Sequence, residues 1–201
     1  MAKISNRETP QTFLQLIFIL TNLVLYVLSQ QNETCTRTRR ITPRSFFNVE
    51  DMLGLWYIHE LYVGEEQDIT EPNFSCLHFT FFNSGIDSLA TEEVYWNMVT
   101  NVTDVLWSDI AIDPVEPAIW KVRSRQSGQE TDWVWLHADF STWGVQYGCS
   151  VVSNYRYEIM TLFTREKILD LATLHCLRQV MEGYGFPEGH IKLIDHNNCG
   201  P

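Results

Sequence analysis

The chain has 201 residues, of which 14 are basic and 25 acidic, and its formal net charge at pH 7 is −11. A hydrophobic content of 45% excludes an intrinsically disordered protein, and only 10 glycines and 7 prolines exclude collagen-like or linker sequence. The acidic balance argues against a nucleic-acid-binding protein, and the length fits one domain with a sizeable core.

The first segment has the organisation of a secretory signal peptide. Lys3 and Arg7 precede a mostly apolar run over 13–28, and Ser29 is a suitable residue before a cleavage point. This run is shorter than the ~20 residues that a transmembrane helix needs, so we expect cleavage rather than a retained membrane anchor. The sequence therefore predicts a signal peptide over 1–29, a single mature domain over 30–201, and a secreted, extracellular protein without a later membrane span.

Segments rich in β-branched and aromatic residues recur after a basic leader over 35–43. Eight of them are predicted strands: 55–63, 76–82, 93–102, 105–112, 118–123, 132–138, 145–152 and 155–164. Turn-forming sequences separate them, such as Asn-Ser-Gly over 83–85 and Gln-Ser-Gly over 126–128. This pattern predicts an all-β fold, an up-and-down antiparallel sheet or barrel.

The hydrophobic period then changes from two to three or four residues. Leu169, Ala172, Cys176 and Val180 form one apolar stripe, which predicts an amphipathic helix over 166–182, and Gly183 ends it. A last short strand is predicted over 190–195. On this stripe Cys176 would be a buried free thiol; an intermolecular disulfide is the alternative.

Secretion gives the cysteines and sequons a specific meaning. In an oxidising compartment four of the five cysteines are expected to form two disulfides, and the count alone leaves fifteen pairings open. Asn32, Asn73 and Asn101 each begin an N-x-[ST] sequon and are predicted glycosylation sites, which would make this a surface-modified glycoprotein.

Signatures of catalysis are absent from the sequence. It contains no G-x-S-x-G, H-E-x-x-H, P-loop or G-x-G-x-x-G motif, and no C-x-x-C pair that would predict a metal site. We therefore expect a protein that is not an enzyme. A catalytic group assembled from residues far apart in sequence is the alternative.

Three short motifs together resemble those of the lipocalins. Gly54-Leu55-Trp56 matches the G-x-W motif at the start of the first strand, Ala138-Asp139-Phe140 resembles the T-D-Y motif with two substitutions, and Arg165 matches the arginine of the third motif. The resemblance implies an eight-stranded antiparallel up-and-down β-barrel with one C-terminal α-helix packed outside. It also implies that Arg165 packs over Trp56 at the closed end of the barrel.

The cysteine positions are similar to those of the apolipoprotein D, insect bilin-binding protein and Lazarillo group of lipocalins. This similarity implies the disulfides Cys35–Cys149 and Cys76–Cys199. The altered second motif and the additional Cys176 depart from that group.

A barrel of eight strands leaves an interior wide enough for one small ligand, and alternate residues of each strand face it. Strand alternation and the family's cavity positions together predict these ligand-binding residues: Leu77, Phe79, Phe81, Trp133, Trp135, His137, Gln146, Ile159, Thr161 and Phe163. The resemblance then implies binding and transport of a small hydrophobic ligand, namely a retinoid, fatty acid, sterol, carotenoid or bilin.

Alternatives remain for several of these interpretations. Trp133 and Trp135 could fill the barrel as core, and His137 could ligate haem, although no cofactor is required and a bilin, carotenoid or haem would be a bound ligand. The alternative function is an extracellular interaction protein whose barrel loops bind a partner such as a cell-surface receptor, without a required ligand.

Overall fold

The computed structural model describes residues 43–63, 73–139, 141–152, 155–184 and 191–200. All of them fall within one unit of the chain, Cys35–Pro201. The predicted signal peptide, the basic leader, Cys35 and the Asn32 sequon lie outside the described residues.

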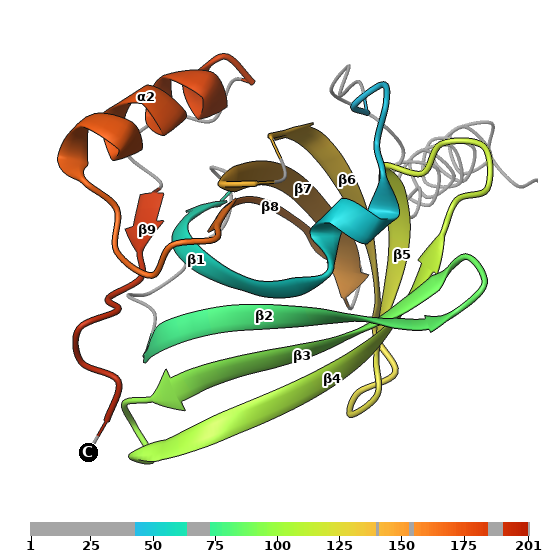
Figure 1. Cartoon of the computed structure of the whole chain (residues 1–201). Coiled ribbons are helices and arrows are strands. Elements are labelled where there is room, and N and C mark those ends of the chain that lie inside the picture. The colour runs from blue at the N-terminus through green and yellow to red at the C-terminus, as the bar shows by residue number, and fades with distance from the viewer. Residues whose placement is uncertain (1–42, 64–72, 140, 153–154, 185–190, 201) are drawn as a thin grey trace, which may run out of the picture. The chain divides into compact units, whose positions relative to one another are not determined.

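Nine strands, a short 3-10 helix and one α-helix make up the described structure (Figure 1). The 3-10 helix η1 spans Val49–Met52 and the α-helix α2 spans Leu171–Glu182. The strands are β1 Gly54–Val63, β2 Phe74–Gly85, β3 Ser88–Asn97, β4 Val102–Ile112, β5 Ile119–Ser124, β6 Glu130–Ala138, β7 Trp143–Val152, β8 Tyr155–Thr164 and β9 Ile191–Leu193.

The strands form one antiparallel sheet that closes into a barrel. Consecutive strands pair from β2 to β8, and β1 pairs with both β8 and β2, which joins the two ends of the sheet. The ninth strand, β9, pairs with β1 beyond the part that β2 covers. This confirms the predicted eight-stranded up-and-down barrel followed by a single helix.

The third strand lies about five residues earlier than the sequence predicts. Its predicted range was 93–102, but β3 ends at Asn97. The Asn97 side-chain carbonyl accepts hydrogen bonds from the backbone N–H groups of Val99 and Thr100, at 3.0 and 3.2 Å. This side-chain contact favours a turn over 98–101 in place of a continued strand.

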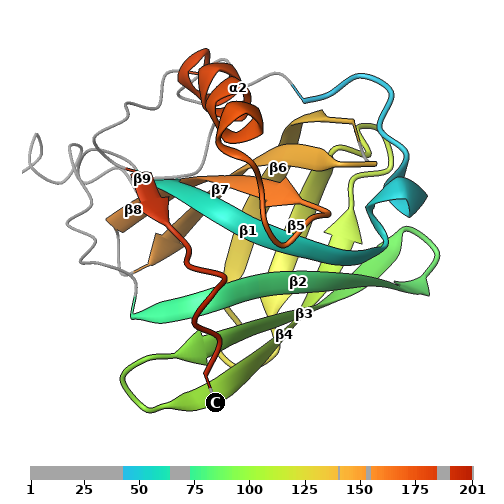
Figure 2. The same ribbon diagram turned by 60° about the vertical axis from the view of Figure 1, so that its left-hand side comes forward.

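Two hydrophobic clusters lie on opposite faces of the barrel wall. One lies inside the barrel and contains Trp56, Trp120 and Trp135. The other lies on the outer face of β6, β7, β8 and the end of β1, where Leu177 and Met181 of α2 cover it. Figure 2 shows α2 over this side of the sheet and the C-terminal segment running past β1 and β2.

The helix begins later than predicted, and the prediction of a buried Cys176 is wrong. Asp170 caps α2 by accepting hydrogen bonds from the backbone N–H groups of Ala172 and Thr173, so the helix starts at Leu171 and not at 166. The face that packs on the barrel contains Leu177 and Met181. Cys176 lies next to Leu177 in the chain but outside that face, and it is a free, exposed thiol.

One ion pair also joins α2 to the barrel. Arg178 donates hydrogen bonds from Nε, at 2.8 Å, and from Nη2 to the Glu60 carboxylate, which is fully buried. The Tyr62 hydroxyl donates to the second oxygen of that carboxylate at 3.0 Å. The helix therefore has a polar attachment at the centre of an otherwise apolar contact.

The C-terminal segment is bonded covalently to the barrel. A disulfide joins Cys76 of β2 to Cys199, as the resemblance implied. The other implied disulfide, Cys35–Cys149, includes a residue outside the described part and stays a prediction. Among the described residues, no helix has both the length and the apolar character that a transmembrane span requires.

Candidate functional site

One end of the barrel is closed by η1 and Arg165. The Trp56 indole N–H donates to the Met52 carbonyl at 2.7 Å. The Arg165 guanidinium lies 3.7 Å over the Trp56 ring and donates to the carbonyls of Leu55 and Asp51, at 2.9 and 2.8 Å. This is the packing that the resemblance implies for the arginine of the third motif, with a cation–π contact that is strengthened by two hydrogen bonds.

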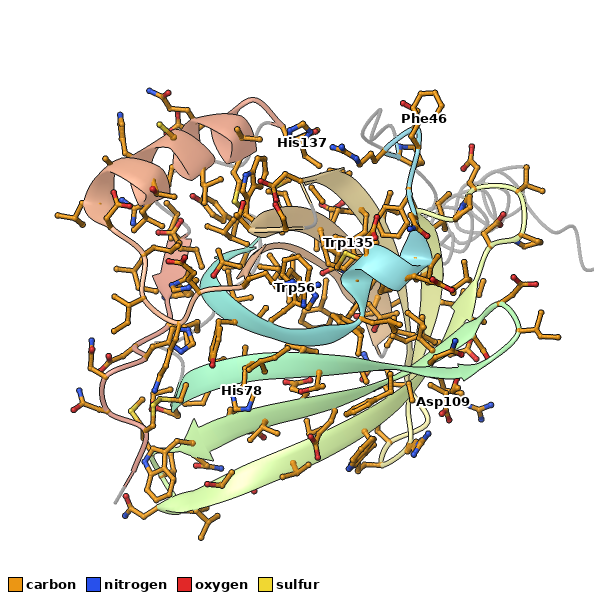
Figure 3. All side chains as sticks on the ribbon, in the orientation of Figure 1. Phe46, Trp56, His78, Asp109, Trp135 and His137 are labelled. Carbon is orange, nitrogen blue, oxygen red and sulfur yellow. A yellow bond between two sulfur atoms is a disulfide. The ribbon has the colours of Figure 1, made fainter. Side chains whose placement is uncertain are left out.

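The half of the interior nearest the closed end is filled by aromatic rings. Trp120 and Trp135 meet edge to face with their ring centroids 5.3 Å apart, and Phe81 lies 5.6 Å from Trp120. Phe47, from the segment before η1, lies 5.8 Å from Trp120. In Figure 3, Trp56 and Trp135 lie together in the middle of the barrel. These rings pack against one another, and we call them the aromatic floor; none of them lines the cavity above it.

The other half of the interior is a cavity of about 200 Å³. Its lining comes from β1, β2, β3, β6, β7 and β8, and is mostly apolar or aromatic. The residues that line it are Ile58, Leu61, Phe74, Leu77, Phe79, Glu93, Thr131, Trp133, Gln146, Gly148, Ser150, Tyr157, Ile159, Thr161 and Phe163. A concave, apolar pocket with a few polar groups is the composition of a small-molecule site.

Most of the predicted ligand-binding residues border this cavity. Those that do are Leu77, Phe79, Trp133, Gln146, Ile159, Thr161 and Phe163. Phe81 and Trp135 face the interior but belong to the aromatic floor, where neighbouring rings surround them. Whether the lining residues touch a ligand stays a prediction; the structure places them where one would fit.

The prediction that His137 faces the interior is wrong. The pairing of β6 with β7 shifts between Trp135 and His137, so His137 lies opposite Val145, which faces outward under α2. Such a bulge inserts one residue and reverses the alternation beyond it. Figure 3 shows His137 at the rim of the barrel, and its side chain is exposed. Its ring lies beside Trp143, and its Nδ1 is 3.5 Å from Arg44 Nη1. A haem ligand inside the barrel is therefore not available from this residue.

A second bulge gives β1 its two roles. The pairing of β1 with β8 shifts between Ile58 and Glu60. Ile58 lines the cavity before the bulge and Leu61 lines it afterwards, while Glu60 faces outward to Arg178. Without this extra residue the alternation would place the Glu60 carboxylate inside the barrel and Leu61 outside.

Two polar side chains of the cavity lining, Glu93 and Gln146, are buried in ways that leave their polar groups without compensation. Glu93 of β3 borders it, and desolvation raises the pKa of its carboxyl to about 7. Gln146 of β7 is 2% exposed, and its Nε2 amide has no hydrogen-bond partner among the described residues. Sequence reasoning predicted Gln146 and missed Glu93, because the strand was misplaced and a glutamate is usually assigned to the solvent face.

Other predicted features lie away from the cavity. Asp139 directly follows β6 and accepts hydrogen bonds from the backbone N–H groups of Thr142 and Trp143. Despite the opposing effect of burial, these and the other hydrogen bonds to its carboxyl lower the pKa of that group. Asn73 and Asn101 are exposed, which leaves both amides open to modification. Within the ranges that the structure describes, no three His, Cys, Asp or Glu side chains gather closely enough to hold a metal ion.

Comparison of the sequence gives no relative. No family model matches the chain, and no curated protein matches it. Comparison of the structure does find similar folds among solved structures. Lobster apocrustacyanin A1 superposes with a TM-score of 0.60 at 13% identity, over 77% of this chain and 82% of that one.

The barrel has the lipocalin fold. Two further solved structures agree with this assignment. The siderocalin Ex-FABP, described as functioning through dual ligand specificities, gives a TM-score of 0.61 at 13% identity, over 72% of this chain and 94% of the other. Apocrustacyanin C2 gives 0.59 at 15% identity, over 76% and 82%. At such identities only the fold of these lipocalins carries over to this chain.

Proposed function

We propose that this chain is a secreted lipocalin that binds and carries a small hydrophobic ligand in the barrel cavity. The observation that carries the proposal is the division of the interior into an aromatic floor and a cavity of about 200 Å³ bordered by apolar and aromatic side chains. A structural barrel would be filled along its whole length, because interiors normally pack to high density. The space that remains is of a size for one small molecule.

The similarity to a siderocalin with dual ligand specificities supports a binding role for the fold. The disulfide between Cys76 and Cys199 supports secretion, since disulfides persist in oxidising compartments. It also matches one of the two bridges that the resemblance to the apolipoprotein D, bilin-binding protein and Lazarillo group implies, and we extend the proposal to that group. We propose further that the protein is not an enzyme and that Asn32, Asn73 and Asn101 are glycosylated.

Native mass spectrometry tests the carrier function, combined with organic extraction of protein purified from its natural source. A stoichiometric hydrophobic molecule is expected. Visible absorbance of the same sample would identify a bilin, carotenoid or haem among the candidates.

A cavity-filling variant links that ligand to the barrel interior. Gly148 borders the cavity, and a Cβ there would lie 3.5 Å from the Trp133 ring, an ordinary contact. The Cβ of Gly148→Leu would therefore fit in ordinary contact with the wall, and the rest of the side chain would take up cavity space, so we expect ligand affinity to fall by about tenfold or more. Val151→Leu, on the outward face of the same strand, is the matched control and is expected to bind normally.

A different result would change the interpretation. If extracted protein is free of ligand and tryptophan fluorescence is unaffected by retinoids, fatty acids, sterols, bilins and lipophilic amines, the carrier function is wrong. The interaction protein, acting through its loops, would then be the better proposal.

A further inference from the structure

The mostly apolar lining of the cavity contains one acidic side chain, that of Glu93. Glu93 is the one ionisable carboxyl among the described lining residues, and no Lys, Arg or His belongs to that lining. In the part of the chain that the structure describes, the Glu93 carboxylate forms no hydrogen bond or salt bridge. Its side chain is partly buried and borders the cavity. A carboxylate in such surroundings is costly unless a ligand pairs with it.

None of the described neighbours of Glu93 supplies a cation or a hydrogen-bond donor to its carboxylate. Its directly paired residues are Phe79 on β2 and Leu106 on β4, and both side chains share its face of the sheet because directly opposite residues point the same way. Aromatic rings that border the same space are Phe74, Phe79, Trp133, Tyr157 and Phe163. Faces of such rings attract a cation and do not attract an anion.

Gln146 adds a second requirement from the opposite wall. Its side chain is almost fully buried, and its Nε2 N–H groups have no acceptor among the described residues. A buried donor without an acceptor costs free energy, which a ligand oxygen or nitrogen would recover. The cavity thus presents one negative group and one unused donor on an apolar, aromatic background.

We propose that the cavity selects a lipophilic amine, a ligand with an apolar body, one protonated amino group that pairs with Glu93, and an acceptor atom for Gln146. This inference rests on the proposed ligand-binding function and narrows its ligand class. Ligands with a carboxylate head, such as fatty acids, are disfavoured because their charge would be buried near Glu93 without a cation.

The selectivity depends on pH through Glu93. Burial raises the pKa of its carboxyl to about 7, so the group is ionised at pH 8.5 and neutral at pH 5.5. The other titratable groups around it are Tyr95 on the same strand, Asp104 opposite Tyr95 on β4, and Tyr157 from β8. None of them is basic. The attraction for an ammonium group is therefore stronger at pH 8.5 than at pH 5.5.

Four probes of one shape test the proposal: 2-phenylethylamine, 2-phenylethanol, phenylacetate and propylbenzene. They differ in head group, which is cationic, neutral polar, anionic or absent. Affinity is measured by calorimetry and by intrinsic tryptophan fluorescence at pH 8.5 and pH 5.5, on the wild-type protein, Glu93→Gln and Glu92→Gln. The last variant is the matched control, because Glu92 is the adjacent residue and does not border the cavity.

At pH 8.5 we expect the wild type to bind the amine at least about tenfold more tightly than the alcohol, and the anion most weakly. The ratio of amine to alcohol affinity is expected to approach one at pH 5.5, and in Glu93→Gln at both pH values. Glu92→Gln is expected to behave as the wild type. The pH series on unmodified protein gives the same information if Glu93→Gln fails to fold.

The other outcomes separate the two proposals. Binding of propylbenzene and the alcohol with no preference for the amine, or with the anion bound best, overturns the amine inference and leaves the carrier function standing. Absence of binding for all four probes in wild type also overturns the amine inference, while the carrier function is decided by the mass spectrometry and fluorescence tests described above.

Discussion

Glu93 is a residue whose surroundings work against its ordinary ionised state. Apolar neighbours raise the pKa of its carboxyl from 4.5 to about 7. Between these two values the folded protein holds a proton that the unfolded chain has lost. The contribution of Glu93 to the free energy of unfolding therefore falls as pH rises from 4.5 through 7.

Glu93→Gln should remove that loss. At pH 8.5 we expect the free energy of unfolding of the ligand-free variant to exceed that of the wild type by about 2–3 kcal/mol, and the two to be equal near pH 4, where the carboxyl is neutral in both states. Urea denaturation of both proteins across this range measures the difference. A variant that is less stable than wild type at pH 8.5 would show that Glu93 has a stabilising partner, against the structure. Glu92→Gln controls for the change in net charge.

At the scale of the elements, the bulges in β1 and β6 determine which side chains of these strands face the barrel interior. Strand alternation correctly placed Leu77 and Phe79 on one face of β2, since that periodicity is written in the sequence. The bulges after Ile58 and after Trp135 could not be predicted from the sequence. This wall of the barrel has hydrophobic residues on both faces because α2 covers its outside, so the pattern looks the same with or without a bulge. His137 was therefore assigned to the wrong face.

The prediction that Cys176 lies on the buried face of α2 was wrong because the sequence allows more than one apolar face for this helix. In the sequence, Cys176 aligns with Leu169 and Ala172, but the Asp170 cap begins the helix after Leu169. The packed face is then set by what α2 meets on the barrel, namely Leu177 and Met181 in the apolar cluster and Arg178 at Glu60. Hydrophobic periodicity identified the helix but could not choose between two overlapping stripes.

The contact of α2 with the barrel gives a prediction at this scale. Arg178→Met removes the cation facing a Glu60 carboxylate that is fully buried, and leaves it only the Tyr62 hydroxyl among the contacts described above. We expect a loss of about 3–5 kcal/mol in the free energy of unfolding, because an unpaired buried charge costs more than the pair contributes. Chemical denaturation at pH 7 measures it.

A matched variant and a double variant make the test specific. Arg125→Met breaks the exposed ion pair with Asp109, whose side chains are 48% and 61% exposed, and is expected to cost about 0–1 kcal/mol. Glu60→Gln combined with Arg178→Met removes both charges and should recover most of the loss. If Arg178→Met costs no more than Arg125→Met, the buried pair does not hold the helix.

For the molecule as a whole, the sequence determined the architecture well and the site incompletely. Eight apolar segments separated by turns, the G-x-W motif and the late helix all predicted the barrel that is observed. The depth of the aromatic floor could not be predicted, because Phe81 and Phe79 are equivalent by alternation and differ only in their distance from the closed end. Where the rings stop filling the interior is a property of three-dimensional packing.

The two ends of the described chain are held to the barrel by different means. The segment before β1 packs Phe47 and η1 onto the closed end, while the C-terminal segment depends on β9, on a hydrogen bond from Ser75 to the Asn198 carbonyl at 2.6 Å, and on the Cys76–Cys199 disulfide. Only three residues of β9 pair with β1. Ile194 and His196 are also buried, and hydrogen bonds to the His59 and Ile58 carbonyls hold them to β1, so the disulfide is one of several attachments of this segment.

Replacement of Cys76 and Cys199 together by serine should lower the free energy of unfolding by about 2–5 kcal/mol, because the bond closes a sequence separation of 123 residues in the unfolded chain. Hydrogen exchange is expected to increase first in 191–200, while the strands around the cavity keep their protection and ligand affinity changes less than about twofold. Cys176→Ser, at the exposed free thiol, is the control and should leave both measurements unchanged. If the double variant loses ligand affinity as strongly as Gly148→Leu, the C-terminal segment supports the cavity itself and is more than an external brace of β1 and β2.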